Sequence, residues 1–386
     1  MRIGRENLLF KKESPMKNIP QEFATCPIVY AVRDTYQIMV PVTKETVMWV
    51  KVGDRCFYDD SNGILRSAVT THRMTVPMKL LDREKKYTVC YRVIHERKPY
   101  FTESGEVMCF ESEFRPVAST PIRIFHIADA HNNVERPVAA GSYFGDKLDL
   151  LILNGDIPNH SGEIEYFTTI HEIAAQLTHG EIPVVFSRGN HDTRGIYAEN
   201  IADHTPTDNG CSYYSFRLGR LWGLVLDCGE DKADENAEYG NTVCCADFRR
   251  RETEYIKSVI ENCRREYEAE GVENRIVVCH VPFTEKFPQP FNIEEETYRL
   301  WAKLLKKHIK PQLMLCGHTH RAYISKVGCE KDYLGQPCPV VVGSNVQKID
   351  GVSRYYGAAI TVYPDHCNIK FNSNIQDIML NEDIIF

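Results

Sequence analysis

Five short polar motifs hold the side chains of this sequence that are best suited to chemistry. Each follows directly after an apolar run, and together they contain aspartate, asparagine and histidine, which bind divalent metal ions through oxygen and nitrogen. The motifs are Asp129-Ala-His131, Gly155-Asp156, Gly189-Asn190-His191-Asp192, His280 and Gly317-His318-Thr-His320. Metal ions that catalyse hydrolysis need such ligands on a rigid frame, with coordination positions left for water and substrate. The motifs therefore predict a hydrolytic site for two metal ions.

The apolar run before each motif is typical of a buried β-strand. These runs are Ile122–Ala128, Leu148–Leu153, Ile182–Phe186, Arg275–Cys279 and Leu313–Cys316. Open α/β folds place ligands at the carboxyl ends of their strands. We therefore expect the five motifs to meet along one rim of a sheet.

Seven of the motif side chains are expected to form two coordination shells. Asp156 is expected to bridge the ions because a carboxylate has two oxygens, and Asn190 offers a neutral amide oxygen. The alternation of side chains in a strand would place His318 and His320 on one side, so that one imidazole serves each ion. The expected shells are Asp129, His131, Asp156 and His320 for one ion, and Asp156, Asn190, His280 and His318 for the other.

Three further residues are expected to act on the substrate. His191 stands beside a ligand without being needed in either shell, so we predict that it is catalytic and assists a leaving oxygen. Asn132 and Arg194 are expected to contact the substrate, although Arg194 could equally be a surface residue that caps a loop. The acidic residues after the run Leu221–Leu226 could line the mouth of the site, but a solvated loop is favoured; they are Asp227, Glu230 and Asp231.

The five motifs in this order resemble the pattern of the calcineurin-like metallophosphoesterase superfamily, which is DxH, GD, GNH(D/E), H and GHxH. The resemblance covers residues of about 120–345 and implies an α/β fold, a four-layer α/β/β/α sandwich of two facing sheets flanked by helices. It also implies two metal ions, commonly manganese, iron or zinc. The expected activity is hydrolysis of a phosphate ester by in-line attack of a metal-bridging hydroxide, with His191 assisting the leaving group.

Two departures separate the sequence from well-known branches of that superfamily. Purple acid phosphatases carry GDxxY and Ser/Thr protein phosphatases carry GDxxD, whereas this sequence has Asn159 at the last position. The first motif of the purple enzymes also lacks a histidine at the position that His131 occupies in this sequence. A purple chromophore is therefore rejected. What orients His191 stays open, with Asp192 as a candidate.

The sequence divides into three predicted regions. Residues 1–25 are expected to form an arm and residues 26–118 a small all-β sandwich, because short strands follow one another there without a convincing helix. This region resembles the fibronectin-III-like domain that precedes the catalytic domain of purple acid phosphatases. Residues 119–386 are expected to form the metallophosphoesterase domain, with helices over Ile164–Leu177, Asp247–Glu268 and Ile293–His308.

Composition indicates a globular protein whose charge is uneven. The chain has 386 residues, 43% hydrophobic and 26% charged, and a net charge of −7. Residues 1–115 hold 19 Lys and Arg against 15 Asp and Glu, which leaves 27 against 38 for the rest. Bound cations would offset part of the charge in the acidic half. The fourteen cysteines show no CxxC pair, and no secretory signal or membrane span is evident. The chain is therefore expected to be cytoplasmic, without a membrane partner and with reduced thiols.

Two alternatives to a phosphomonoesterase stay open. A phosphodiesterase or nuclease would use the same chemistry, but the acidic catalytic half makes nucleic acid an unlikely partner because a nuclease needs a basic track. A non-catalytic metal-binding scaffold of the same fold is disfavoured, since both His191 and Asn190 are present.

Overall fold

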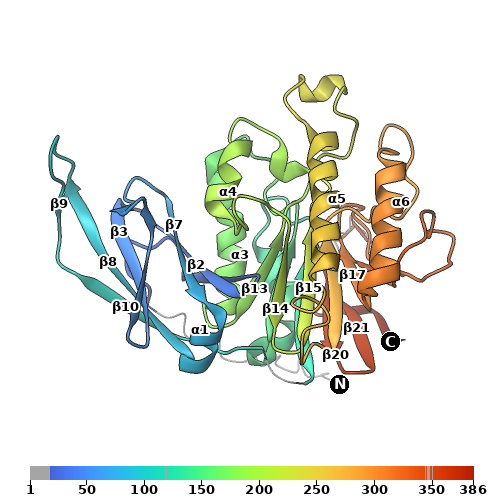
Figure 1. The fold of residues 1–386 in the computed structure, drawn as a ribbon, viewed down its shortest axis with the longest axis horizontal. Helices are drawn as coiled ribbons and strands as arrows, with labels where there is room; N and C mark the ends of the chain where they lie inside the picture. The colour runs from blue at the N-terminus through green and yellow to red at the C-terminus, as the bar shows by residue number, and fades with distance from the viewer. Residues whose placement is uncertain (1–17, 118–119, 344, 346–347, 350) are drawn as a thin grey trace, which may run out of the picture.

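The computed structural model describes residues 18–117, 120–343, 345, 348–349 and 351–386. Two large β-sheets face each other, and helices cover their outer surfaces (Figure 1). The nine-stranded sheet has the order β22-β21-β20-β11-β12-β13-β1-β2-β7, and the six-stranded sheet the order β14-β15-β16-β17-β19-β18.

The strands of the nine-stranded sheet come from both ends of the chain. They are Ile28–Val32 (β1), Thr35–Pro41 (β2), Thr71–Pro77 (β7), Ile122–Ile127 (β11), Leu150–Asn154 (β12), Pro183–Ser187 (β13), Tyr356–Val362 (β20), His366–Ser373 (β21) and Ile378–Ile385 (β22). The six-stranded sheet comprises Tyr214–Leu218 (β14), Leu221–Leu226 (β15), Asn274–Cys279 (β16), Leu313–Cys316 (β17), Tyr323–Ser325 (β18) and Val340–Val342 (β19). The helices are Met78–Glu84 (α1), Glu135–Gly141 (α2), Thr168–Thr178 (α3), Ile201–His204 (α4), Cys245–Glu261 (α5) and Glu295–Leu304 (α6).

Alternating side chains divide the core into layers. In β12, Leu150 and Ile152 pack between the two sheets, whereas Leu151 and Leu153 pack toward α2 and α3. In β16, Ile276 and Val278 face the other sheet while neighbouring side chains pack on α5 and α6. Strands covered on both faces need apolar side chains at every position, which explains the uninterrupted apolar runs. The order helix, sheet, sheet, helix confirms the predicted four-layer sandwich.

The β-rich first part of the chain forms a sandwich, one layer of which continues the nine-stranded sheet. Its separate sheet contains Thr46–Val52 (β3), Arg55–Tyr58 (β4), Lys86–Glu96 (β8), Glu103–Ser104 (β9) and Met108–Glu113 (β10), and Asp60–Ser61 (β5) pairs with Ile64–Leu65 (β6). This sheet packs on β2 and β7 through one shared core. Strand β1 pairs in parallel with β13, with Val29 opposite Pro183 and Tyr30 opposite Val184. The division at residue 118 stays a prediction, but the strands on its two sides form one sheet.

Several expected elements need correction. The first part contains a helix, α1, which was not predicted. Helix α5 ends at Glu261 rather than Glu268, because Asn262 adopts a non-helical conformation and turns follow. Residues 65–76 do not form one continuous strand but are divided between β6 and β7. In the expected N-terminal arm, residues 1–17 lie outside the described residues. The rest of that segment packs on β2, where Phe23 is buried and pairs with Val42.

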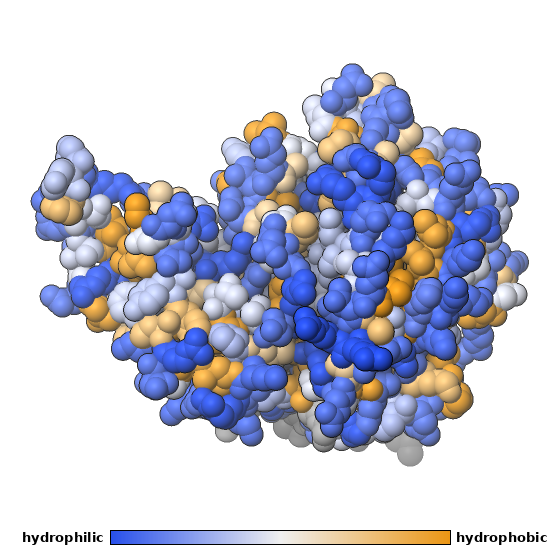
Figure 2. All heavy atoms as spheres, viewed as in Figure 1, coloured by the Kyte–Doolittle hydropathy of each residue, from blue (hydrophilic) through white to orange (hydrophobic). Residues whose placement is uncertain are grey.

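The sheet of β3, β4, β8 and β10 projects from the body of the molecule and carries apolar surface near its tip (Figure 2). Tyr100 and Phe101 are the most exposed large apolar side chains of that tip. No helix within the described ranges is long and apolar enough to cross a membrane.

Removal of residues 1–118 is expected to unfold the catalytic part, because it would strip β1, β2 and β7 from the common sheet and expose β13. Five consecutive buried residues of β1 would be lost. Each large apolar side chain contributes about 1.5–3 kcal/mol, against a total stability of about 5–15 kcal/mol. The test is solubility and thermal denaturation of the truncated chain beside the full chain. A truncated protein that melts cooperatively at the same temperature would show that the first part is a mere appendage.

Candidate metal centre

The five motifs meet where strands of both sheets end. Strands β11, β12 and β13 of one sheet and β16 and β17 of the other each precede a motif. The expectation of one rim on one sheet is therefore wrong, because the rim is shared by two facing sheets. All seven predicted ligands and His191 come together at this rim.

The first group consists of Asp129, His131 and His320, whose ligand atoms all lie within 4.8 Å of one another. The Nε2 atoms of His131 and His320 are 2.9 Å apart. Asp129 Oδ1 lies 3.9 Å from the former and 3.4 Å from the latter. Such converging nitrogen and oxygen atoms could hold one metal ion.

The second group consists of Asp156, His280 and His318, again within 4.8 Å. His280 Nε2 lies 3.1 Å from Asp156 Oδ2 and 3.8 Å from Asp129 Oδ1, so the two groups are adjacent. Asn190 joins this group, since its Oδ1 lies 3.0 Å from His318 Nδ1. The two predicted histidine pairs thus fall into separate groups, as a two-ion site requires.

Hydrogen bonds outside these groups aim the ligand atoms inward. His280 Nδ1 donates to the carbonyl of Asn154 at 2.7 Å, which leaves the buried Nε2 facing the carboxylates. Asn190 Nδ2 donates to Asp231 at 3.4 Å, which turns its Oδ1 toward His318. Bonds of this kind fix the tautomer and orientation of metal-binding side chains.

The backbone at the site is in an unusual conformation. Five of the seven predicted ligands have left-handed φ: 55° at Asp129, 46° at His131, 53° at Asp156, 68° at His318 and 52° at His320. Each such residue costs on the order of 1–3 kcal/mol, and such strain clusters at functional sites. The alternation expected for His318 and His320 is wrong, because β17 ends at Cys316 and both residues lie in a turn.

Glycines make the close approach of these turns feasible. A Cβ on Gly189 would lie 2.3 Å from Asp156 Oδ1, and one on Gly155 would lie 2.5 Å from His280 Nδ1. A Cβ on Gly317 would lie 2.7 Å from Asp129 Oδ2. The GD, GNH and GH motifs therefore need glycine at these positions, because there is no room for a side chain.

The buried carboxylates dominate the electrostatics of the site. Burial lowers the pKa of His280, but Asp156 and Asp129 outweigh this and raise the pKa to about 10. Burial opposes ionisation of Asp156, yet His280 and the neighbouring histidines hold its pKa well below the ordinary value. Burial and then His280 lower the pKa of His318 to about 4. A proton on His280 would compete with a cation, so metal affinity should rise with pH.

His191 is positioned by backbone rather than by a carboxylate. Its Nδ1 donates to the carbonyl of Asn159 at 2.7 Å, and its backbone N–H donates to Asp156 Oδ1 at 2.8 Å. Its Nε2 is left 4.0 Å from Asp156 Oδ2, facing the site. Asn159 thus orients this ring through its main chain, although its side chain has no charge.

Asp192, the candidate for orienting His191, has other partners. Its carboxylate accepts hydrogen bonds from the backbone of Gly189 at 2.6 Å and Asp156 at 3.3 Å. Burial, together with the charge of Asp156, raises the pKa of Asp192 to about 8. Asp192 instead ties the GD and GNH turns to each other.

Arg194 reaches the site on two acidic partners. Its guanidinium donates to Glu230 at 2.8 Å and to Asp231 at 2.8 Å, and its Nη1 lies 3.4 Å from His191 Nε2. Glu230 is only 1% exposed and Asp227 is fully buried, so the expectation of a solvated loop is wrong. The feature of the sequence that could have indicated these partners is the acidic pair Glu230 and Asp231, which comes soon after strand β15.

The side-chain oxygen of Asn132 is already engaged. It accepts a hydrogen bond from the backbone N–H of Asn159 at 2.9 Å. Asn132 thus braces the residue whose carbonyl holds His191, and a contact with substrate through its amide group stays a prediction.

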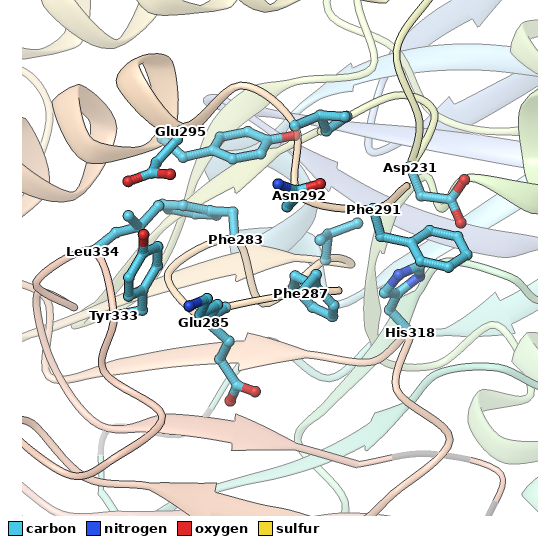
Figure 3. Close-up of a pocket in the computed structure, with 14 residues that line it drawn as sticks. Asp231, Phe283, Glu285, Phe287, Phe291, Asn292, Glu295, His318, Tyr333 and Leu334 are labelled. Atoms are coloured by element: carbon cyan, nitrogen blue, oxygen red, sulfur yellow. The ribbon is translucent and has the colours of Figure 1, made fainter. Parts of the chain in front are cut away.

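An aromatic pocket adjoins the second group and was not predicted. Figure 3 shows Phe287, Phe291 and Asp231 gathered beside His318. The rings of Phe287 and His318 have centroids 5.7 Å apart. Most of its walls come from the segment that follows His280, where several aromatic residues are close in sequence.

A family model matches the sequence, and solved structures share the fold. Residues 122–322 match the family model of the calcineurin-like phosphoesterases. The structure resembles purple acid phosphatase PPD1 from seeds of yellow lupin (Lupinus luteus), with a TM-score of 0.58 and 12% identity over 93% of this chain and 74% of that chain. It also resembles PhoD, with a TM-score of 0.58 and 13% identity over 95% of this chain and 89% of that chain. No curated protein sequence matches the chain significantly.

The sandwich of two sheets and the family match over more than half of the sequence define the class. The chain belongs to the calcineurin-like phosphoesterase family. Its fold, including the β-rich first part, is that of the purple acid phosphatase and PhoD structures.

The substitution Gly189→Ala is expected to weaken metal binding at least about tenfold, since the new Cβ would displace Asp156 and a misplaced ligand costs such factors. Metal content after dialysis and thermal denaturation measure the effect. Gly335→Ala is the control for strain away from the site: its Cβ meets nothing within 4 Å but its φ is +83°, so it should lose some stability and keep metal binding. Full metal occupancy in Gly189→Ala would contradict the role of this close approach.

Proposed function

We propose that this protein hydrolyses phosphate esters with the help of two bound metal ions. The observation that carries the proposal is the convergence of two adjacent His and Asp groups with His191 Nε2 beside them. The family match supports the same reaction class.

The residues fit two ions of manganese, iron or zinc. Carboxylate and imidazole ligands in each group suit these metals, and the amide of Asn190 adds a neutral oxygen. His280 Nε2 is buried and lies 3.1 Å from Asp156 Oδ2 and 3.8 Å from Asp129 Oδ1, so a cation that replaced its proton would meet a nitrogen and two carboxylates. Asp129, His131 and His320 would hold one ion, and Asn190, His280 and His318 the other, with Asp156 between them.

The ions, when bound, would lower the pKa of a water and neutralise charge on the phosphoryl oxygens. The protein supplies the remaining parts of the reaction. His191 Nε2 would donate a proton to the leaving oxygen, because Nδ1 is engaged by the Asn159 carbonyl and only Nε2 faces the site. Arg194 Nη1 would bind a phosphoryl oxygen beside it, held in place by Glu230 and Asp231.

The test of the function is hydrolysis of p-nitrophenyl phosphate and bis-p-nitrophenyl phosphate by protein freed of metal and reloaded with Mn²⁺, Fe²⁺ or Zn²⁺. Metal-dependent turnover is expected, and the preferred ester distinguishes a monoesterase from a diesterase. Absence of turnover with every metal, in protein that holds two ions, would contradict the proposal and favour a scaffold.

His191→Ala and His280→Ala are expected to fail in different ways. His191→Ala should keep both metals and KM while kcat falls about 10²–10⁴-fold, the usual contribution of a general acid. His280→Ala should lose metal, because it removes a buried ligand. Metal analysis beside kinetics separates the two, and a His191→Ala protein without metal would overturn the assigned role.

Arg194→Lys, which keeps the charge near the buried Glu230, should keep metal and raise KM.

A further inference from the structure

We propose that the pocket beside His318 binds an aromatic ring on the alcohol part of the phosphate ester. This inference rests on the proposed function and adds the class of substrate: an ester whose leaving alcohol carries a flat aromatic group. Three observations carry it, namely the position of the pocket, its walls and the way these walls are held.

The pocket opens directly from the candidate metal centre. Two of its lining residues, His318 and Asp231, also belong to that centre. Asp231 accepts hydrogen bonds from Asn190 and Arg194. A phosphoryl group at the centre would therefore have its ester substituent within reach of the pocket.

Eight of the fourteen lining residues are apolar or aromatic, and five of these eight carry an aromatic ring. The lining includes Phe283, Phe287, Phe291, Tyr298 and Tyr333, together with Val281, Ile293 and Leu334. The hollow is open to solvent, and the empty space in it and at its mouth amounts to about 590 Å³. Flat rings pack face-to-face and edge-to-face on such walls.

Polar side chains lie among the apolar ones. Lys286, Asn292, Glu285 and Glu295 line the same pocket. The Lys286 ammonium lies 5.3 Å from the centre of the Tyr333 ring. An aliphatic chain cannot form hydrogen bonds with these groups, whereas a ring with polar atoms on its edge can. This pairing of stacking walls with edge groups favours an aromatic substituent.

The walls are held in place before any ligand binds. The backbone N–H groups of Tyr333 and Leu334 donate to the carbonyl of Thr284 at 3.1 and 3.0 Å. Lys232, from the loop after β15, has its ammonium 5.4 Å from the centre of the Phe291 ring. Three chain segments are thus joined around one pocket.

Inert phosphonates test this inference without the influence of leaving-group reactivity. Phenylphosphonate and methylphosphonate share the phosphoryl group and differ in the ring. Calorimetric titration of the metal-loaded protein is expected to give phenylphosphonate at least about a tenfold lower Kd, as stacking on aromatic side chains provides. In Phe287→Ala and Phe291→Ala this preference should fall several-fold while the Kd of methylphosphonate is kept.

Two further variants guard the test. Phe287→Leu keeps apolar volume near His318 but removes the ring. It therefore tests the ring even if Phe287→Ala disturbs the metal centre, and it should also lose the preference for phenylphosphonate. Phe101→Ala is the control, because Phe101 is 76% exposed on the projecting sheet. Melting temperature and metal content are measured for each variant.

Equal Kd values for the two phosphonates, in protein that hydrolyses phosphate esters, would overturn the pocket inference and leave the proposed function standing. A phenyl preference that persists in both Phe287→Leu and Phe291→Ala would overturn it as well. Absence of hydrolysis together with failure to bind either phosphonate would overturn both proposals.

Discussion

The structure of the site depends on the burial of two carboxylates, Asp129 and Asp156, at the ends of neighbouring strands. Both are almost completely inaccessible to solvent, and neighbouring negative charges in such a place are unfavourable unless cations meet them. In the metal-free protein the raised pKa of His280 lets it hold a proton, whose charge offsets part of the negative charge of the two carboxylates. Two metal ions would offset that charge more fully, because they supply more positive charge and take the histidines as neutral ligands.

The same constraint explains the strained turns around the site. At three of the five strand ends the chain bends toward the other ligands through left-handed conformations, which are found at Asp129, at Asp156 and in the GHTH turn. Glycines leave the room for these bends, and Asp192 ties two of the turns together through backbone hydrogen bonds. The large core between and behind the sheets supports this local strain.

The sequence revealed the metal centre because its ligands lie in short motifs, each directly after a strand. It was less informative where contacts are long-range. That the backbone carbonyl of Asn159 holds His191 cannot be read from side-chain types, since the side chain of Asn159 is not the partner. The burial of Glu230 depends on Arg194 and on Arg249, which binds its backbone, so composition alone indicated a solvated loop.

Long-range contacts also limited how much of the fold could be predicted from the sequence. The resemblance to the superfamily implied the four layers, whereas the apolar runs predicted the individual strands, because burial on both faces imposes an apolar pattern on each strand. The fusion of the first part with the catalytic sheet depends on the pairing of β1 with β13, which are about 150 residues apart in sequence and carry no local signal of it. The pocket walls were missed for a similar reason, since Phe287 and Tyr333 meet only through the tertiary structure.

The claim that two ions share this rim is tested most directly by anomalous diffraction from crystals of the manganese-loaded protein. Two anomalous peaks are predicted, one beside Asp129, His131 and His320 and the other beside Asn190, His280 and His318, with Asp156 touching both. A single peak, or peaks away from these side chains, would contradict the account.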